Sequence, residues 1–235
     1  MGRRTAVTWV TGAAIVAAAV CVIVLGPIER GESFHRYADQ RQWLGIPHAG
    51  DVLSNLAFVV VALRFLRRVP ALALAVTWIG VGSAIYHWGP SDTTLALDWA
   101  PIGVTLMLVL SAVIHDRIGP RAGQVTQTFG PLAAVVAVGY WLILGGTGDG
   151  DGNRGDMAPY VALQLLGVAL PPLLAIIAPG RIAVRYLLAA VGCFVAARIL
   201  GAYDTQLLDA IAISGHSLKH IAAAAAAACV LRACG

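Results

Sequence analysis

Long apolar runs separated by short polar connections dominate the hydrophobic pattern of this 235-residue chain. A transmembrane helix needs about 20 predominantly apolar residues, and a window of that length locates the candidate spans. Eight segments qualify, residues 6–26, 51–68, 71–88, 95–115, 127–145, 159–178, 181–200 and 214–232. The pattern therefore predicts an all-α fold, a polytopic transmembrane helical bundle that forms a single membrane domain over residues 1–235.

The first segment, residues 6–26, follows Arg3 and Arg4 and therefore also fits the charge pattern of a signal peptide. Its apolar run is long, and it lacks a clear small-x-small cleavage site before Gly26 and Pro27. We interpret it as an additional N-terminal helix. Cleavage would not change the orientation of the other seven spans.

Composition agrees with a membrane protein and excludes an ordinary soluble domain. Hydrophobic residues make up 59% of the chain and charged residues 12%, and the mean hydropathy is +0.79. The net charge of +4 comes without a basic stripe interleaved with aromatic residues, so no nucleic-acid partner is expected. The four cysteines lie in or at the end of apolar segments without CxxC spacing, which favours a packing role.

Arginine positions predict the orientation, because cytoplasmic connections carry more positive charge than outer ones. With the N-terminus inside, the inner ends carry Arg3, Arg4, Arg64, Arg67, Arg68, Arg117, Arg121, Arg181, Arg185 and Arg232. The outer connections carry Arg30, Arg36, Arg41, Arg154 and Arg198. We therefore expect both termini in the cytoplasm.

Polar side chains interrupt the apolar runs at two distant places. Ser83 and His87 lie four residues apart at the end of one span, as do His216 and His220 at the start of the last. Four residues is about one helical turn, so each pair shares a helix face. Polar side chains in a membrane are costly and tend to be functional. A catalytic zinc ion typically takes three protein ligands and a water, which makes the three histidines candidate zinc ligands.

The predicted topology places these residues at one depth. The span 71–88 runs outward and ends at His87, and the next span re-enters with Asp98 about one turn down. The last span starts outside with His216 and His220. The alternative interpretation is that these residues are ordinary core histidines. Such histidines would not be expected to lie at the same depth in the membrane. We therefore expect a site near the outer leaflet.

Asp98 and Ser83 complete the expected site. Asp98 either accepts the proton of a zinc-activated water or orients a liganding imidazole. Ser83 either donates its hydroxyl to the oxyanion of a tetrahedral intermediate or bonds back to its own helix. Spacing alone leaves both alternatives open.

Other polar residues have simpler expectations. Asp51 is expected to pair with Lys219 or to cap the span that it begins. Lys219 could reach an anionic lipid headgroup, although that pairing or snorkelling is the simpler account. Asp204 is expected to be exposed. The polar connection 27–50 forms either a lid over the site or a solvated loop at the headgroups. His35, His48 and His115 have no second histidine at the spacing of one helical turn.

The order and spacing of the candidate residues resemble those of the alkaline ceramidases. The matching pattern is Ser83-x3-His87, then Asp98 eleven residues after His87, then His216-x3-His220. These enzymes belong to a superfamily of seven-helix membrane hydrolases that also includes progestin/adiponectin-receptor-like proteins. The resemblance covers about residues 48–232, which would form the seven-helix core.

This resemblance implies a zinc-dependent amidase. Its lipid substrate would be ceramide or a related long-chain amide, cleaved at the N-acyl bond into a fatty acid and a sphingoid base or amine. The resemblance implies that His87, His216 and His220 bind Zn2+, that Asp98 activates the water and that Ser83 stabilises the oxyanion. The alternative function is a receptor-like seven-helix membrane protein with a structural or vestigial zinc site.

The chain departs from this family at its N-terminal side. Eukaryotic alkaline ceramidases resemble one another in an acidic, Trp-containing calcium site, whereas here His48 stands six positions before Ser54 and no acidic cluster precedes it. Calcium dependence is therefore doubtful. The Gly/Asp-rich stretch 145–156 lacks the bidentate Glu of an EF-hand and predicts a flexible outer loop. Alanine-rich helices and short loops indicate a bacterial homologue in the inner membrane.

Overall fold

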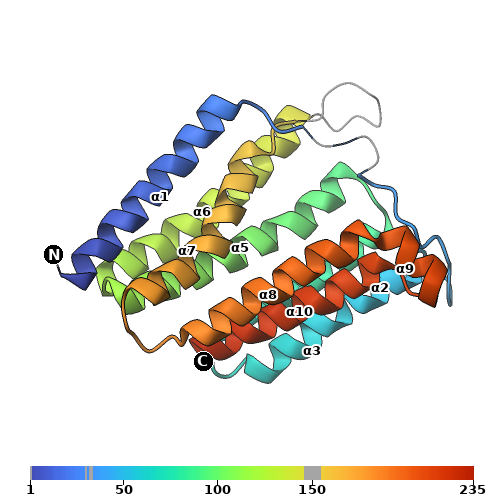
Figure 1. Cartoon of the computed structure of the whole chain (residues 1–235). Helices are drawn as coiled ribbons and strands as arrows, with labels where there is room; N and C mark the ends of the chain where they lie inside the picture. The colour runs from blue at the N-terminus through green and yellow to red at the C-terminus, as the bar shows by residue number, and fades with distance from the viewer. Residues whose placement is uncertain (1, 30, 32–33, 146–154) are drawn as a thin grey trace. The chain divides into compact units, whose positions relative to one another are not determined.

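The computed structural model describes residues 2–29, 31, 34–145 and 155–235, and helices dominate this part of the chain (Figure 1). Its helices are α1 (Arg3–Leu25), α2 (Ala49–Ser54), α3 (Leu56–Phe65), α4 (Pro70–Trp88), α5 (Asp92–Arg117), α6 (Pro120–Gly145), α7 (Ala158–Ile177), α8 (Val184–Ala202), α9 (Asp204–Ile211) and α10 (Gly215–Cys234). Within these residues the only strand pairing is an isolated bridge between Trp43 and Ile46. The all-α prediction is confirmed. Most of the predicted loop 145–156 lies outside the described residues.

Contacts between helices divide the chain into two compact units. The first comprises mainly residues 1–32 and 103–187, and in it α1 and α6 pack against α7. The second comprises mainly residues 33–102 and 188–233, and in it α2 and α3 pack against α4. All five candidate site residues belong to the second unit, so one compact unit contains the whole candidate site.

Seven helices of the described chain are long and apolar enough to cross a membrane, namely α1, α4, α5, α6, α7, α8 and α10. Large apolar side chains are exposed along several of them, and Ile23 and Ile143 each expose 79% of their surface. Contiguous exposed apolar surface marks contact with a membrane or a partner, and along helices of this length it indicates lipid. The chain thus has the build of a multi-pass membrane protein.

The remaining predicted span, residues 51–68, is interrupted. Ser54 Oγ and Asn55 Nδ2 donate to the Asp51 carbonyl oxygen at 3.0 and 2.8 Å. In a regular α-helix that oxygen would accept from the Asn55 backbone N–H, which instead donates to Val52 at 3.3 Å. Because side chains compete for the carbonyl, α2 ends at Ser54 and α3 begins at Leu56. The prediction of an uninterrupted helix over 51–68 is therefore wrong.

A close contact between α4 and α5 places Ser83 beside Asp98. A Cβ atom at Gly82 would overlap the backbone carbonyl of Leu97. Glycine is therefore required where these helices meet. Ser83 and Asp98 are the next residues on each side of this contact, so the packing of two backbones determines how near they lie.

A second close contact fixes the start of α10. A Cβ atom at Gly215 would overlap the Leu200 carbonyl and would lie 2.8 Å from Cα of Asp204. The first residue of α10 thus packs directly on the end of α8 and the start of α9. His216 follows at once, so its position depends on this contact.

We expect Gly82→Ala to destabilise the second unit, because the added methyl group would overlap backbone that moves only if α5 moves. Overpacking of this kind typically costs about 1–3 kcal/mol. Thermal unfolding in detergent measures the loss. Gly192→Ala is the matched control, since Gly192 lies in α8 with nothing within 4 Å of its added Cβ. Equal melting temperatures for the two variants would contradict the close contact.

Candidate metal centre

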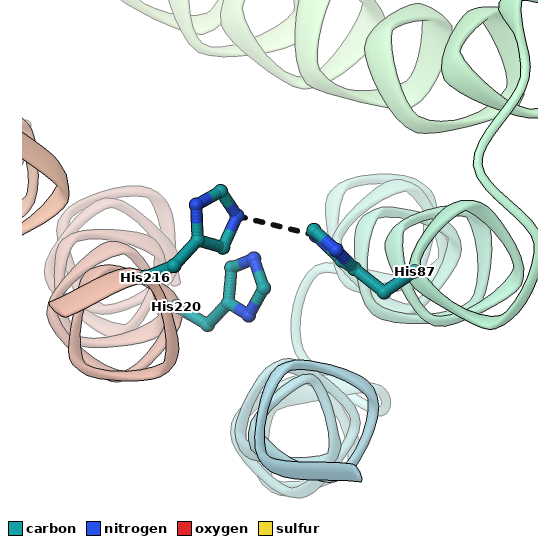
Figure 2. A group of neighbouring side chains, drawn as sticks. All are labelled: His87, His216 and His220. Carbon is teal, nitrogen blue, oxygen red and sulfur yellow. Dashed lines mark hydrogen bonds between the residues drawn. The ribbon is translucent and has the colours of Figure 1, made fainter. Parts of the chain in front are cut away.

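Three histidine side chains from two helices converge in the second unit (Figure 2). His87 projects from the last turn of α4, and His216 and His220 project from the first two turns of α10. One ring nitrogen of each residue lies within 4.8 Å of those of the other two. Nε2 of His87 and Nε2 of His216 are 3.2 Å apart. The structure therefore brings together the histidines that helical spacing had placed in two separate groups.

This nitrogen set fits a tetrahedral metal ion. Two nitrogens bound to one zinc at about 2.0–2.1 Å lie about 3.4 Å apart, close to the 3.2 Å between His87 and His216. His87 is only 1% exposed, and its Nδ1 has no hydrogen-bond partner in the described residues. A buried nitrogen without a partner is costly. The convergence of three imidazole nitrogens is therefore the observation that indicates a metal site, whereas Nδ1 of His87 is the ring nitrogen that does not face His216.

Ser54 determines which nitrogen of His220 carries the hydrogen. The Ser54 hydroxyl oxygen lies 3.0 Å from the Asp51 carbonyl oxygen and 2.8 Å from Nδ1 of His220. A carbonyl oxygen only accepts, so the single hydroxyl hydrogen goes to Asp51 and Nδ1 of His220 donates to Ser54. In the neutral ring, Nε2 then keeps the lone pair that a metal ion binds.

The Ser83 and Asp98 side chains form a pair beside the histidines. Ser83 is buried, and its hydroxyl hydrogen-bonds to the Asp98 carboxyl group. Oδ1 of Asp98 is buried without a hydrogen-bond partner in the described residues. Asp98 also interacts electrostatically with Lys219, whose Nζ lies 3.4 Å from Nε2 of His216. Lys219 therefore contacts the histidine cluster and interacts electrostatically with the predicted carboxyl group.

An aromatic ring from the connection before α2 covers the histidines. The Tyr37 ring centroid lies 4.6 Å from that of His87 and 4.8 Å from that of His216, and Tyr37 is 9% exposed. Nearby, Nδ1 of His48 donates to the His87 carbonyl oxygen at 2.9 Å. Of the two interpretations of this connection, these contacts favour a cover over the site.

The pair formed by Asp39 and Arg41 anchors this cover. The Asp39 carboxylate accepts from Nε and Nη2 of Arg41 at 2.7 and 2.6 Å and from the Arg41 backbone N–H at 3.0 Å. Nη2 of Arg41 also donates to the Ala212 carbonyl at 2.9 Å, which ties the cover to the segment before α10. Hydrogen bonds from the Arg41 guanidinium lower the pKa of the Asp39 carboxyl group.

Asp51 joins α2 to the start of α10. Its side chain is fully buried, and Oδ1 accepts from the hydroxyls of Ser214 and Ser217 at 2.8 and 2.7 Å. Asp51 lies in the first turn of α2, where a carboxylate was expected, but neither a capping hydrogen bond nor a direct pair with Lys219 is found. No side chain caps α2, and among the described residues no carboxylate lies within 4.0 Å of the Lys219 ammonium group.

Sequence spacing did not identify three residues that support the site, Tyr37, Ser54 and Asp204. Asp204 was expected to be exposed, but it is partly buried, and its Oδ1 accepts from the His216 backbone N–H at 2.9 Å. That expectation is wrong. A polar residue inside an apolar span, near the depth of the histidines, is a signal that could have found Ser54. Tyr37 and Asp204 lie in connections, where polar side chains are ordinary and no helical period relates them to the histidines.

We expect Ser54→Ala to weaken zinc binding by about 10- to 100-fold, the usual effect of removing a partner that orients a liganding histidine. Competition with a chromophoric chelator in detergent measures the affinity. Ser54→Thr keeps the hydroxyl and should bind zinc nearly as well. Thr128→Ala, which removes an exposed back-bond on α6, controls for loss of a hydroxyl elsewhere. Unchanged affinity in folded Ser54→Ala would refute the role of Ser54.

The Asp39 carboxylate should stabilise the cover in a pH-dependent manner. Because its folded pKa is lowered, its contribution is complete above the unfolded pKa of about 3.9 and is lost as pH falls through the folded value. Asp39→Asn should therefore melt a few degrees below wild type at pH 7, and this difference should shrink toward pH 3. Asp209→Asn, at an exposed position, should melt like wild type throughout. A difference that does not vary with pH would point to packing alone.

Comparisons of this chain with protein-family models, curated proteins and solved structures found no match. The interpretation of the site therefore rests on its own geometry. That geometry is a set of three histidines able to bind a metal ion, with a carboxyl and a hydroxyl group beside it.

Proposed function

We propose that this protein is a zinc-dependent hydrolase of long-chain lipid amides, with ceramidase-like chemistry. The convergence of His87, His216 and His220 beside the pair formed by Ser83 and Asp98 carries the proposal. Structural zinc sites usually have four protein ligands, whereas catalytic sites keep one position open. Three histidines and an adjacent carboxyl group match the catalytic pattern better than the structural one.

The proposed enzyme is an inner-membrane protein of a bacterium. In this proposal residues 48–232 form the seven-helix core, α1 is an additional helix, both termini are cytoplasmic and the site lies near the outer leaflet. The distribution of arginines between alternate connections supports this orientation. The seven long apolar helices support the multi-pass arrangement.

The proposed reaction adds water across the amide bond. A bound zinc ion would supply a Lewis acid and a water molecule whose pKa is lowered to about 7. Asp98 takes a proton from the attacking water through Oδ1, the oxygen without a hydrogen-bond partner. It then gives that proton to the amide nitrogen as the carbon–nitrogen bond breaks. The products are a fatty acid and a free amine, and Asp98 is first a general base and then a general acid.

The hydrogen bonds already present favour this role for Asp98 over orientation of a ligand. Nδ1 of His220 is held by Ser54, so that ring does not need Asp98 to orient it. The bond that Asp98 makes is with Ser83. This leaves one oxygen of its carboxyl group for the water.

Ser83 can act twice because its hydroxyl carries one hydrogen that can turn between two acceptors. While Asp98 is ionised, Ser83 donates to the carboxylate and orients it. Once Asp98 is protonated on Oδ1, its other oxygen is an uncharged carbonyl and a weaker acceptor, so the Ser83 hydrogen can turn toward the substrate oxygen. That oxygen becomes negative at the same moment, so the donor is supplied when it is needed.

We expect Asp98→Asn to retain zinc and to lose about 10²- to 10⁴-fold in amide hydrolysis, the usual contribution of a general base. Zinc content and fatty-acid release from N-palmitoyl sphingosine are measured on the purified protein in detergent. Asp209→Asn controls for loss of a carboxylate and should keep full activity. If wild type binds zinc and releases no fatty acid from any N-acyl lipid tested, the hydrolase proposal fails and the receptor-like alternative gains support.

A further inference from the structure

Lys219 is the only lysine in the chain, where all other basic residues except histidine are arginines. It lies between His216 and His220 on α10. A lysine near a helix end usually extends its ammonium group to water. Here the side chain follows α8 instead, since a Cβ atom added at Gly201 would lie 3.1 Å from Cδ of Lys219. Its Nζ ends 3.4 Å from Nε2 of His216, so the positive charge is directed into the site.

The Lys219 ammonium group forms no direct ion pair in the described part of the chain, since no carboxylate there lies within 4.0 Å. Three carboxylates, of Asp51, Asp98 and Asp204, interact with it at longer range. Each of them has other hydrogen-bond partners. Asp51 accepts from Ser214 and Ser217, and Asp98 bonds to Ser83. Asp204 accepts from the backbone N–H groups of His216 and Ala38.

The ammonium group and a metal ion held by the three histidines would repel each other, and an anionic group of a ligand placed near both would be attracted by both. Charged hydrogen bonds in a partly buried site are strong and selective. Ceramide carries only hydroxyl groups next to its amide and offers no such anionic group.

We infer that the substrate is an N-acyl amino acid and that Lys219 binds its carboxylate. This inference rests on the proposed amide hydrolysis at the same site. In such a lipid one carbon atom separates the carboxylate from the amide nitrogen. A single ligand can therefore reach the histidine cluster with its amide carbonyl and Lys219 with its carboxylate. Lys219 is thus a specificity-determining residue for the charge next to the bond that breaks.

N-palmitoylglycine and N-palmitoylglycinamide test the inference, because they differ in that charge and in little else. Wild type should hydrolyse the acid with a kcat/KM about 10- to 100-fold higher than the amide, the range expected for a charged hydrogen bond. Lys219→Met should lose most of this preference, because kcat/KM should fall further for the acid than for the amide. Lys219→Arg keeps the charge and should retain part of the preference. Zinc content is measured for every variant.

Binding separates this inference from the proposed function. Equilibrium dialysis of the two labelled lipids against zinc-loaded protein gives their dissociation constants without any reaction. If both are hydrolysed equally well by wild type, the inference fails while the hydrolase proposal stands. A third outcome is that neither lipid is hydrolysed, but wild type binds the acid more tightly than the amide and Lys219→Met does not. In that case the hydrolase proposal fails, while the inference that Lys219 binds the carboxylate of a ligand stands. An equal loss for both lipids in Lys219→Met that retains zinc would overturn the assignment.

Discussion

Three imidazole rings that face one another inside an apolar bundle are the constraint on which the second unit depends. One nitrogen of each ring lies within 4.8 Å of those of the other two. In an apolar interior, polar atoms without hydrogen-bond partners cost free energy. The surrounding polar groups serve to hold these rings in place. The Ser54 hydroxyl accepts a hydrogen bond from His220, and the Asp204 carboxylate accepts one from the backbone N–H of His216. His48 donates a hydrogen bond to the carbonyl oxygen of His87.

The first turn of α10 shows how backbone packing and polar contacts cooperate in this arrangement. Gly215 allows the helix to begin directly on the Leu200 carbonyl. Asp51 accepts from Ser214, the N-cap, and from Ser217 in the first turn. Two histidines and a lysine then follow on a helix whose start is fixed from two sides. Rigid placement of this kind is what a site needs if its side chains are to converge without further movement.

The sequence predicted the parts of this structure that depend on local patterns. Apolar length located the long helices, and the four-residue spacing placed His216 and His220 on one face. The interruption at Asn55 escaped prediction because it arises when side chains compete with the backbone for one carbonyl. The cover by Tyr37 and the direction of Lys219 depend on contacts between segments distant in sequence. No periodicity encodes such contacts.

The broken helix between α2 and α3 also has a thermodynamic consequence. The Asp51 carbonyl oxygen accepts hydrogen bonds from the Ser54 and Asn55 side chains. In a straight helix the same oxygen would accept from the Asn55 backbone N–H. Straightening would release the Ser54 hydroxyl and free the His220 ring to carry its hydrogen on either nitrogen. The broken and straight forms would then differ in metal affinity. By reciprocity, a bound ion would favour the broken form by the same free energy, so occupancy of the site and the shape of this helix would be linked.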